Sequence, residues 1–107
     1  MKIGIIGAGN EGTALATSST RAGHQVTISG GGPTSAAKAA ATSGARAAAT
    51  NREAVEGADV VVIAVWFGAA ESVLTELGDA LDGKVVIDTT NPVKPDLSGL
   101  LVPAPAS

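Results

Sequence analysis

The feature that most constrains the fold is a glycine motif near the start of the chain, Gly7-x-Gly9-x-x-Gly12. It directly follows an apolar run at residues 3–6, which contains consecutive β-branched residues and is typical of a buried strand. A segment of high helix propensity follows the motif, beginning Thr13-Ala14. A strand, a glycine turn and a helix in this order predict the phosphate-binding unit of a dinucleotide-binding fold.

Each glycine of the motif has its own predicted task. Gly7 permits the tight turn, Gly9 leaves room for a pyrophosphate against the backbone, and Gly12 lets the helix pack closely on the strand. The helix N-terminus offers free N–H groups and a partial positive charge to phosphates. Asn10 and Glu11, within the motif, are therefore also predicted to border the cofactor. The alternative is a glycine turn that binds nothing.

The composition narrows the class of protein. A chain of 107 residues suits one domain, and 45% hydrophobic with only 2% aromatic residues predicts an aliphatic core. A net charge of −3 without a basic block argues against nucleic acid and membrane surfaces as partners. The chain has no cysteine and one histidine, His24, so we expect no disulfide and no metal site. Met1 leads straight into the first strand rather than into a secretory leader, which predicts a cytoplasmic protein.

Strand-like and helix-like segments alternate along the rest of the chain. This alternation predicts an α/β fold, a Rossmann-type doubly wound and mostly parallel sheet with helices on both faces and about five strands. The domain is expected to span residues 1–95, with a C-terminal tail at 96–107. The expected strands are 3–6, 26–29, 45–49, 60–65 and 84–88, and the expected helices are 10–22, 34–43, 51–56 and 69–77.

Two helices have predicted buried faces. In the first helix the small-residue stripe consists of Ala14, Leu15, Ser18 and Ala22. In the last helix the apolar face consists of Ala70, Val73, Leu74 and Leu77.

The loop after the second strand bears on the choice of cofactor. NAD-binding folds place an Asp or Glu there to hold the ribose 2′-OH, whereas this chain reads Ser29-Gly30-Gly31-Gly32-Pro33-Thr34-Ser35. The absence of a carboxylate favours NADP over NAD. The expected donors to the 2′-phosphate are the hydroxyl groups of Ser29, Thr34 and Ser35, the backbone N–H groups of Gly30 and Gly31, and the charge of Lys38. The alternative is a flexible glycine loop that touches no ligand.

The carboxyl ends of the later strands are expected to face the same ligand. Trp66 and Phe67, the two aromatic residues of the chain, follow the strand at 60–65 and either line the nicotinamide pocket or close the core. Polar residues and a proline, Thr89-Thr90-Asn91-Pro92, follow the last strand. Asp88 is interpreted as a strand-end cap, and no catalytic acid or base is predicted.

These residues together resemble a known family. The segments Lys2-Ile3-Gly4-Ile5-Ile6-Gly7-Ala8-Gly9-Asn10, Ala22-Gly23-His24-Gln25-Val26 and Val85-Val86-Ile87-Asp88-Thr89-Thr90-Asn91-Pro92, with the glycine loop after Ser29, are similar to coenzyme F420-dependent NADP oxidoreductases. The resemblance covers about residues 1–93. Members of this family often carry an arginine in the loop after Ser29, where this chain has glycine, and they are longer.

The resemblance implies direct hydride transfer between the deazaflavin C5 and the nicotinamide C4, with the protein positioning the two cofactors. It implies that Gly7, Gly9, Asn10 and Gly12 hold the pyrophosphate and that the Ser29 loop holds the 2′-phosphate. It further implies that the nicotinamide is bordered by Ala64, Val65, Trp66, Asn91 and Pro92.

The expected function is therefore an NADP-dependent oxidoreductase domain with coenzyme F420 or a related small-molecule acceptor as second substrate. The alternative is a non-catalytic dinucleotide-binding module or subunit that lacks its substrate half. An unfinished sheet edge would also favour a homodimer.

Overall fold

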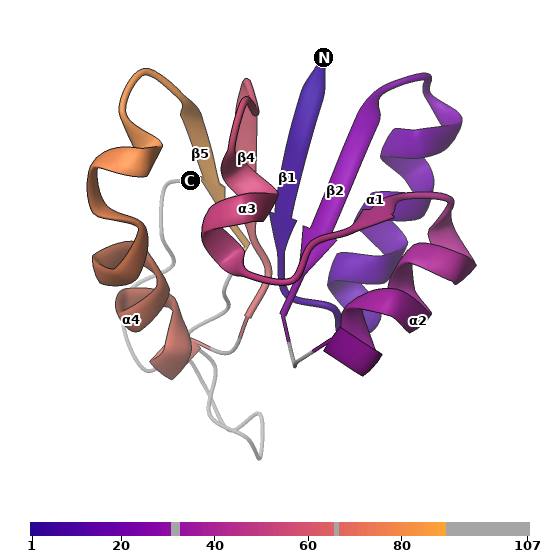
Figure 1. The fold of residues 1–107 in the computed structure, drawn as a ribbon, viewed down its shortest axis with the longest axis horizontal. Helices are drawn as coiled ribbons and strands as arrows, with labels where there is room; N and C mark the ends of the chain where they lie inside the picture. Colours follow the sequence, from indigo (N-terminus) through magenta and orange to yellow (C-terminus); the bar gives the residue numbers. More distant parts are fainter. Residues whose placement is uncertain (31–32, 66, 90–107) are drawn as a thin grey trace, which may run out of the picture.

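Five parallel strands form one sheet in the computed structural model, which describes residues 1–30, 33–65 and 67–89 (Figure 1). The strands are β1 (Lys2–Ile6), β2 (Gln25–Ser29), β3 (Arg46–Ala47), β4 (Val60–Ile63) and β5 (Val85–Asp88), in the spatial order β3-β2-β1-β4-β5. The chain thus moves outward from β1 through β2 and β3, then returns to the other side of β1. This reversal is the topological switch of a doubly wound fold, and the predicted fold class is confirmed.

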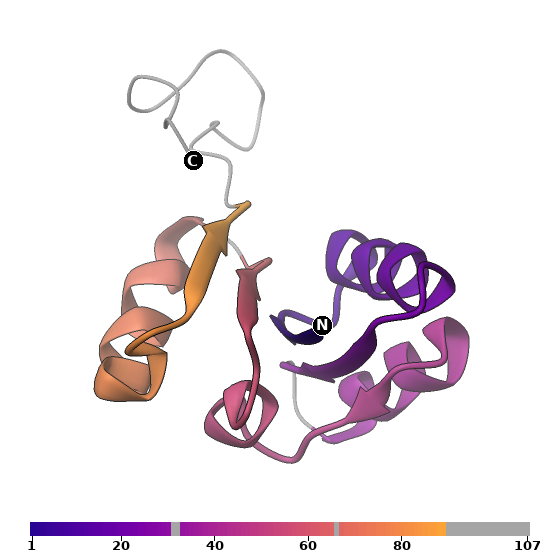
Figure 2. The ribbon, with the colours of Figure 1, turned by 90° about the horizontal axis from the view of Figure 1, so that it is seen from above.

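Helices cover both faces of the sheet. The helices are α1 (Asn10–Arg21), α2 (Pro33–Ser43), α3 (Asn51–Val55) and α4 (Phe67–Leu77), followed by the 3₁₀ turn η1 (Gly78–Leu81). Figure 2 shows α1 and α2 together on one side and α4 on the other. Ala16 of α1 and Ala39 of α2 pack in one apolar cluster, and Val55 of α3 and Leu77 of α4 pack in the second. Two clusters on opposite faces give the predicted three layers.

Successive side chains along a strand point to opposite faces of the sheet, so each strand contributes residues to both clusters. Ile5 belongs to the cluster under α1 and α2, whereas its neighbour Ile6 belongs to the cluster under α3 and α4. Val62 and Ile63 of β4 divide in the same way. Strands that bury both faces need apolar residues at every position, which explains the uninterrupted aliphatic runs in the sequence.

The predicted buried faces of the helices are partly wrong. In α1, Ala14 and Ser18 are exposed, as is Ala22 just beyond it, whereas Gly12 and Ala16 are buried. The glycine turn directs Gly12 toward the sheet, and residues four apart share a helix face, so the buried face includes position 16. In α4 the other three predicted core residues are buried, but Leu74 is 37% exposed.

Several element boundaries differ from the expected ones. The strand expected at 60–65 ends at Ile63, and the strand expected at 45–49 is reduced to Arg46–Ala47. The short helix α3 begins where its capping pattern predicts, because the Thr50 side chain accepts a 3.1 Å hydrogen bond from the Glu53 N–H. The expected tail at 96–107 lies outside the described residues. Within the described ranges, no helix has the length and apolar character needed to cross a bilayer.

Candidate dinucleotide-binding site

The candidate site lies where the carboxyl ends of β1, β2 and β4 meet, around the turn that joins β1 to α1. Gly7 has a φ of 123°, a conformation that side-chain-bearing residues rarely adopt. Its N–H donates a 2.7 Å hydrogen bond to the Ser29 carbonyl at the end of β2. A Cβ at Gly7 would collide with the carbonyl of Ala64, the residue after β4. Glycine is therefore required here both by the backbone angle and by the neighbouring strand.

Two further glycines pack against the same turn. A Cβ at Gly12 would collide with the Gly7 carbonyl oxygen, so α1 lies as close to the turn as its backbone permits. Gly30 has a φ of 119°, and a Cβ there would lie 3.0 Å from both the nitrogen and the Cα of Gly7. The turn is thus held by backbone from three directions.

Gly9 is different, because the space beside it is open. No atom lies within 4 Å of a Cβ built at Gly9, and the residue is exposed. Gly9 is also the N-cap of α1, where no side chain caps the helix. The first N–H groups of a helix have no acceptor within the helix, so this end offers donors to an anion beside an unobstructed backbone. Asn10 and Glu11, both exposed, form the first turn around it.

At the end of β2 the Ser29 side chain faces the protein interior. It is 1% exposed, and its hydroxyl donates a 2.8 Å hydrogen bond to Asn51 Oδ1. Since a hydroxyl has one proton, Ser29 has none left to donate to a phosphate. Thr34, in the first turn of α2, and Lys38, in the middle of α2, are by contrast exposed.

Lys38 and Asn10 line a common groove. This groove lies between α1 and α2, begins at Ala8 of the glycine turn, and has a volume of about 580 Å³. That volume is within the usual range of small-molecule sites. Lys38 and the first turn of α1 therefore line the same groove.

The end of β4 forms the other side of the site. Ala64 and Val65 are partly exposed, and the Ala64 N–H donates to the Ile6 carbonyl at 2.7 Å. Thr89, just after β5, donates both its N–H and its hydroxyl to the Ile63 carbonyl, at 3.0 and 2.8 Å. The backbone on this side is therefore fixed beside Gly7.

The structure accordingly brings most of the described candidates to one edge of the sheet. Those around the turn are Gly7, Gly9, Asn10, Glu11, Gly12, Ser29, Gly30, Ala64 and Val65, while Thr34 and Lys38 lie on α2. Four other candidates lie outside the described residues, namely Gly31, Trp66, Asn91 and Pro92.

Asn51 is a residue that the sequence analysis missed. Besides accepting from Ser29, its side-chain nitrogen donates a 3.1 Å hydrogen bond to Glu76 Oε1. The sequence feature that could have indicated it is its position at the start of a helix that follows a strand. Such a residue lies at the carboxyl ends of the strands, as the glycine turn does. Its partners are 22 and 25 residues away in the sequence, so the contacts themselves leave no local pattern.

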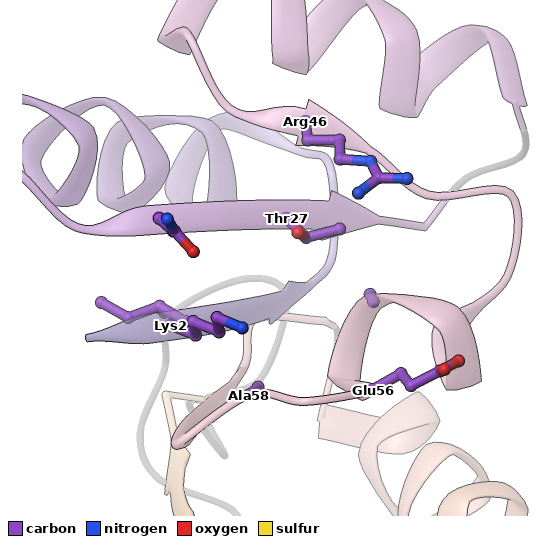
Figure 3. A pocket seen from close by; sticks show the side chains of 8 residues that line it. Lys2, Thr27, Arg46, Glu56 and Ala58 are labelled. Atoms are coloured by element: carbon purple, nitrogen blue, oxygen red, sulfur yellow. The ribbon is translucent and has the colours of Figure 1, made fainter.

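A second, smaller cavity lies at the other end of the strands. It has a volume of about 150 Å³ and is lined by Lys2, Thr27, Arg46, Glu56 and Ala58, among others (Figure 3). Lys2 is the first residue of β1, so this cavity lies away from the carboxyl ends where doubly wound sheets bind ligands. It is not part of the candidate site. Within the described ranges, no three His, Asp or Glu side chains are grouped to hold a metal ion.

Comparison with known proteins gives a match over most of the chain. Residues 2–92 match the family described as NADP oxidoreductase, coenzyme F420-dependent. The chain is 34% identical over 111 residues to the F420-dependent NADP reductase of Methanothermobacter marburgensis, an alignment covering 95% of this chain and 50% of that protein. The chain thus spans about half the length of the curated relatives it matches.

Solved structures show the same fold. A crystal structure from Arthrobacter sp. FB24, assigned to the F420-dependent NADP reductases, superposes with a TM-score of 0.76 at 28% identity, covering 88% of this chain and 47% of that one. The imine reductase of Myxococcus stipitatus in complex with NADP⁺ superposes with a TM-score of 0.77 at 26% identity, covering 87% and 33% respectively.

Proposed function

This chain belongs to the family of coenzyme F420-dependent NADP oxidoreductases, and on this premise we propose that the glycine turn binds NADP(H) for hydride transfer to or from a deazaflavin of the F420 type. The observation that carries the proposal is the uncapped start of α1 at Gly9, with open space beside a turn that Gly7, Gly12 and Gly30 hold rigidly. A rigid backbone with free N–H donors suits a pyrophosphate, because no reorganisation is needed on binding.

The proposed placement of the dinucleotide follows the strand order. The pyrophosphate lies at Gly9 and the first turn of α1, and the adenosine ribose lies at the end of β2. Because Ser29 gives its proton to Asn51, the donors to the 2′-phosphate in this placement are Thr34, Lys38 and the backbone of the glycine loop. The nicotinamide lies against Ala64 and Val65, with Trp66, Asn91 and Pro92 proposed from the resemblance alone.

The second substrate supplies the redox chemistry, since a deazaflavin accepts or donates hydride directly. The protein's own task is then to hold the nicotinamide in a fixed position and to exclude water from it. In the proposal no side chain of this chain takes or gives a proton during the transfer. We also propose that the protein acts in the cytoplasm.

We also propose that the protein forms a homodimer. β5 is an edge of the described sheet, and its Val85 and Ile87 are 60% and 42% exposed. Exposed apolar residues on the strand at the edge of the described sheet favour association. Sedimentation at micromolar concentration should show a dimer, and a monomer at all accessible concentrations would contradict this part of the proposal.

A second candidate function is a dinucleotide-binding module without catalysis. It is supported by the length of the chain, which spans about half of its curated relatives. Turnover distinguishes the two functions: a module binds NADPH but does not oxidise it in the presence of F420, flavin or ferric acceptors.

Calorimetric titration with NADPH and with NADH tests the binding proposal. We expect NADPH to bind more tightly, because the loop after β2 has no carboxylate and Lys38 lines the groove that begins beside the glycine turn. Lys38→Gln should weaken NADPH binding and leave NADH binding nearly unchanged. Lys2→Gln, the same charge change at the opposite end of the sheet, is the matched control and should alter neither. Tighter binding of NADH by the unmodified protein would contradict the placement of the 2′-phosphate.

A further inference from the structure

A chain of hydrogen bonds crosses three elements beside the candidate site. Ser29 at the end of β2 donates to Asn51 Oδ1 at 2.8 Å, and Asn51 Nδ2 donates to Glu76 Oε1 at 3.1 Å. Asn51 opens α3, and Glu76 lies in the last turn of α4. Arg52, next to Asn51, also donates to the Glu76 carbonyl at 3.5 Å, so α3 and α4 are joined twice at this point.

The direction of these hydrogen bonds is fixed by Glu76. An ionised carboxylate accepts hydrogen bonds and cannot donate them, so Asn51 must turn its NH₂ group toward Glu76. Its carbonyl oxygen then faces Ser29, and Ser29 must donate. Because the Ser29 side chain is 1% exposed, loss of this acceptor would leave a buried hydroxyl group unpaired.

Ser29 in turn holds the glycine turn. Its backbone carbonyl accepts the Gly7 N–H at 2.7 Å, and Gly30, the next residue, packs against the Gly7 backbone. The Ser29 side chain and the Ser29 carbonyl thus connect Asn51 to Gly7 through a single residue. A shift of Ser29 would move the acceptor on which the conformation of Gly7 depends.

We propose that Asn51 is a positioning residue of the dinucleotide site, which acts on the Gly7 turn through Ser29 and is itself oriented by Glu76. This inference rests on the proposed function, in which the turn holds the pyrophosphate. Asn51 makes no contact with the pyrophosphate in this proposal; it fixes the backbone that does.

Amide hydrogen exchange measured by NMR tests the inference without any nucleotide. The Gly7 N–H reports on the turn, and the Asp59 N–H, which donates to the Lys2 carbonyl at 2.8 Å, reports on the opposite end of the same strand. In Asn51→Leu we expect exchange at Gly7 to become about two- to tenfold faster, the weakening expected when one hydrogen bond is lost. Exchange at Asp59 should remain unchanged.

A pair of substitutions provides a rescue. Asn51→Asp keeps an acceptor for Ser29 but faces the Glu76 carboxylate with a like charge, so it should speed Gly7 exchange as Asn51→Leu does. Adding Glu76→Gln restores a donor on the α4 side and should return Gly7 exchange to the original rate. Glu71→Gln in place of Glu76→Gln is the control, because Glu71 is an exposed carboxylate on the same helix and should not rescue.

The NADPH affinity of each variant should follow its Gly7 exchange rate, several-fold weaker in Asn51→Asp and recovered in the rescued variant. Unchanged exchange at Gly7, or an equal increase at Gly7 and Asp59, would overturn the inference, since the latter means general destabilisation. Failure of the unmodified protein to bind NADPH would instead overturn the proposed function and the cofactor part of this inference. The exchange rates would then still decide whether Asn51 positions the turn.

Discussion

The same substitution, alanine, should have different effects on stability at two glycines of the same motif. Gly9 has φ −79° and ψ −167°, which alanine adopts readily, and its Cβ would meet no atom within 4 Å. Restricting the unfolded chain stabilises the protein by about 0.4–1 kcal/mol, and the poorer capping by alanine costs about 0.5–1 kcal/mol. Gly9→Ala should therefore leave the free energy of unfolding within about 0.5 kcal/mol of its original value.

Gly12→Ala should destabilise the fold instead. The added Cβ would collide with the Gly7 carbonyl oxygen and lie 2.9 Å from the Gly7 carbonyl carbon, and neither atom belongs to a flexible side chain. Such overpacking costs about 3 kcal/mol at the upper end of its usual range, offset by about 1 kcal/mol of helix propensity. The net loss of about 2 kcal/mol corresponds to a Tm lower by about 8–16 °C.

NADPH binding separates the two effects further. The Gly9→Ala methyl group would occupy the open space at the start of α1, where the proposed pyrophosphate approaches the backbone. Loss of one hydrogen bond to a charged phosphate, about 1.5–3 kcal/mol, weakens binding by about 10- to 150-fold. Thermal denaturation and calorimetric titration of both variants provide the measurements. The reasoning would be refuted if Gly9→Ala bound NADPH as the unmodified protein does, or if it lowered the Tm as much as Gly12→Ala.

Two further predictions concern stability alone. Thr50→Ala removes the acceptor of the Glu53 N–H at the start of α3 and should lower the free energy of unfolding, measured by urea denaturation, by about 0.5–2 kcal/mol. Thr42→Ala, on the exposed surface of a helix, is the control and should change this free energy little. Equal effects of the two substitutions would contradict the capping role. Ile63→Val, at a position with 0% exposure, should cost about 0.5–1.5 kcal/mol. Ile87→Val, where the side chain is 42% exposed, should cost less than about 0.5 kcal/mol. A larger loss of stability in Ile87→Val than in Ile63→Val would contradict the assignment of Ile63 to the core.

The fold could be predicted because its main signals are local. The glycine motif fixes the first turn, and the β-branched run that becomes β4 reads as a buried strand without any knowledge of its neighbours. The short β3 was harder, since Arg46 and Ala47 are both exposed and carry no strand pattern; only the alternation of elements suggested it. Boundaries shifted where the tertiary structure ends a strand earlier than its apolar residues do, as at Ile63.

For the site, the sequence predicts the backbone of the glycine turn but not the side-chain contacts around it. The tasks of the glycines follow from the motif. The buried face of α1, however, depends on how the turn orients the helix. Gly12 and Ala16 are therefore buried, in place of the predicted small-residue stripe. The direction of the Ser29 side chain depends on Asn51, whose position relative to β2 is set by the sheet order. Such contacts form only in the assembled fold, between residues far apart in the sequence, so no local sequence pattern predicts them.

The central place of β1 also has a consequence for synthesis on the ribosome. β1 pairs with β2, complete at residue 29, and with β4, complete only at residue 63. At about 5–20 residues per second, the 34 residues between these points leave one edge of β1 without its partner for about 2–7 s. An unpaired apolar strand can associate with other chains during this time. Ala64, whose backbone packs against Gly7, directly follows β4. This contact with the glycine turn can therefore form only after β4 has been synthesised.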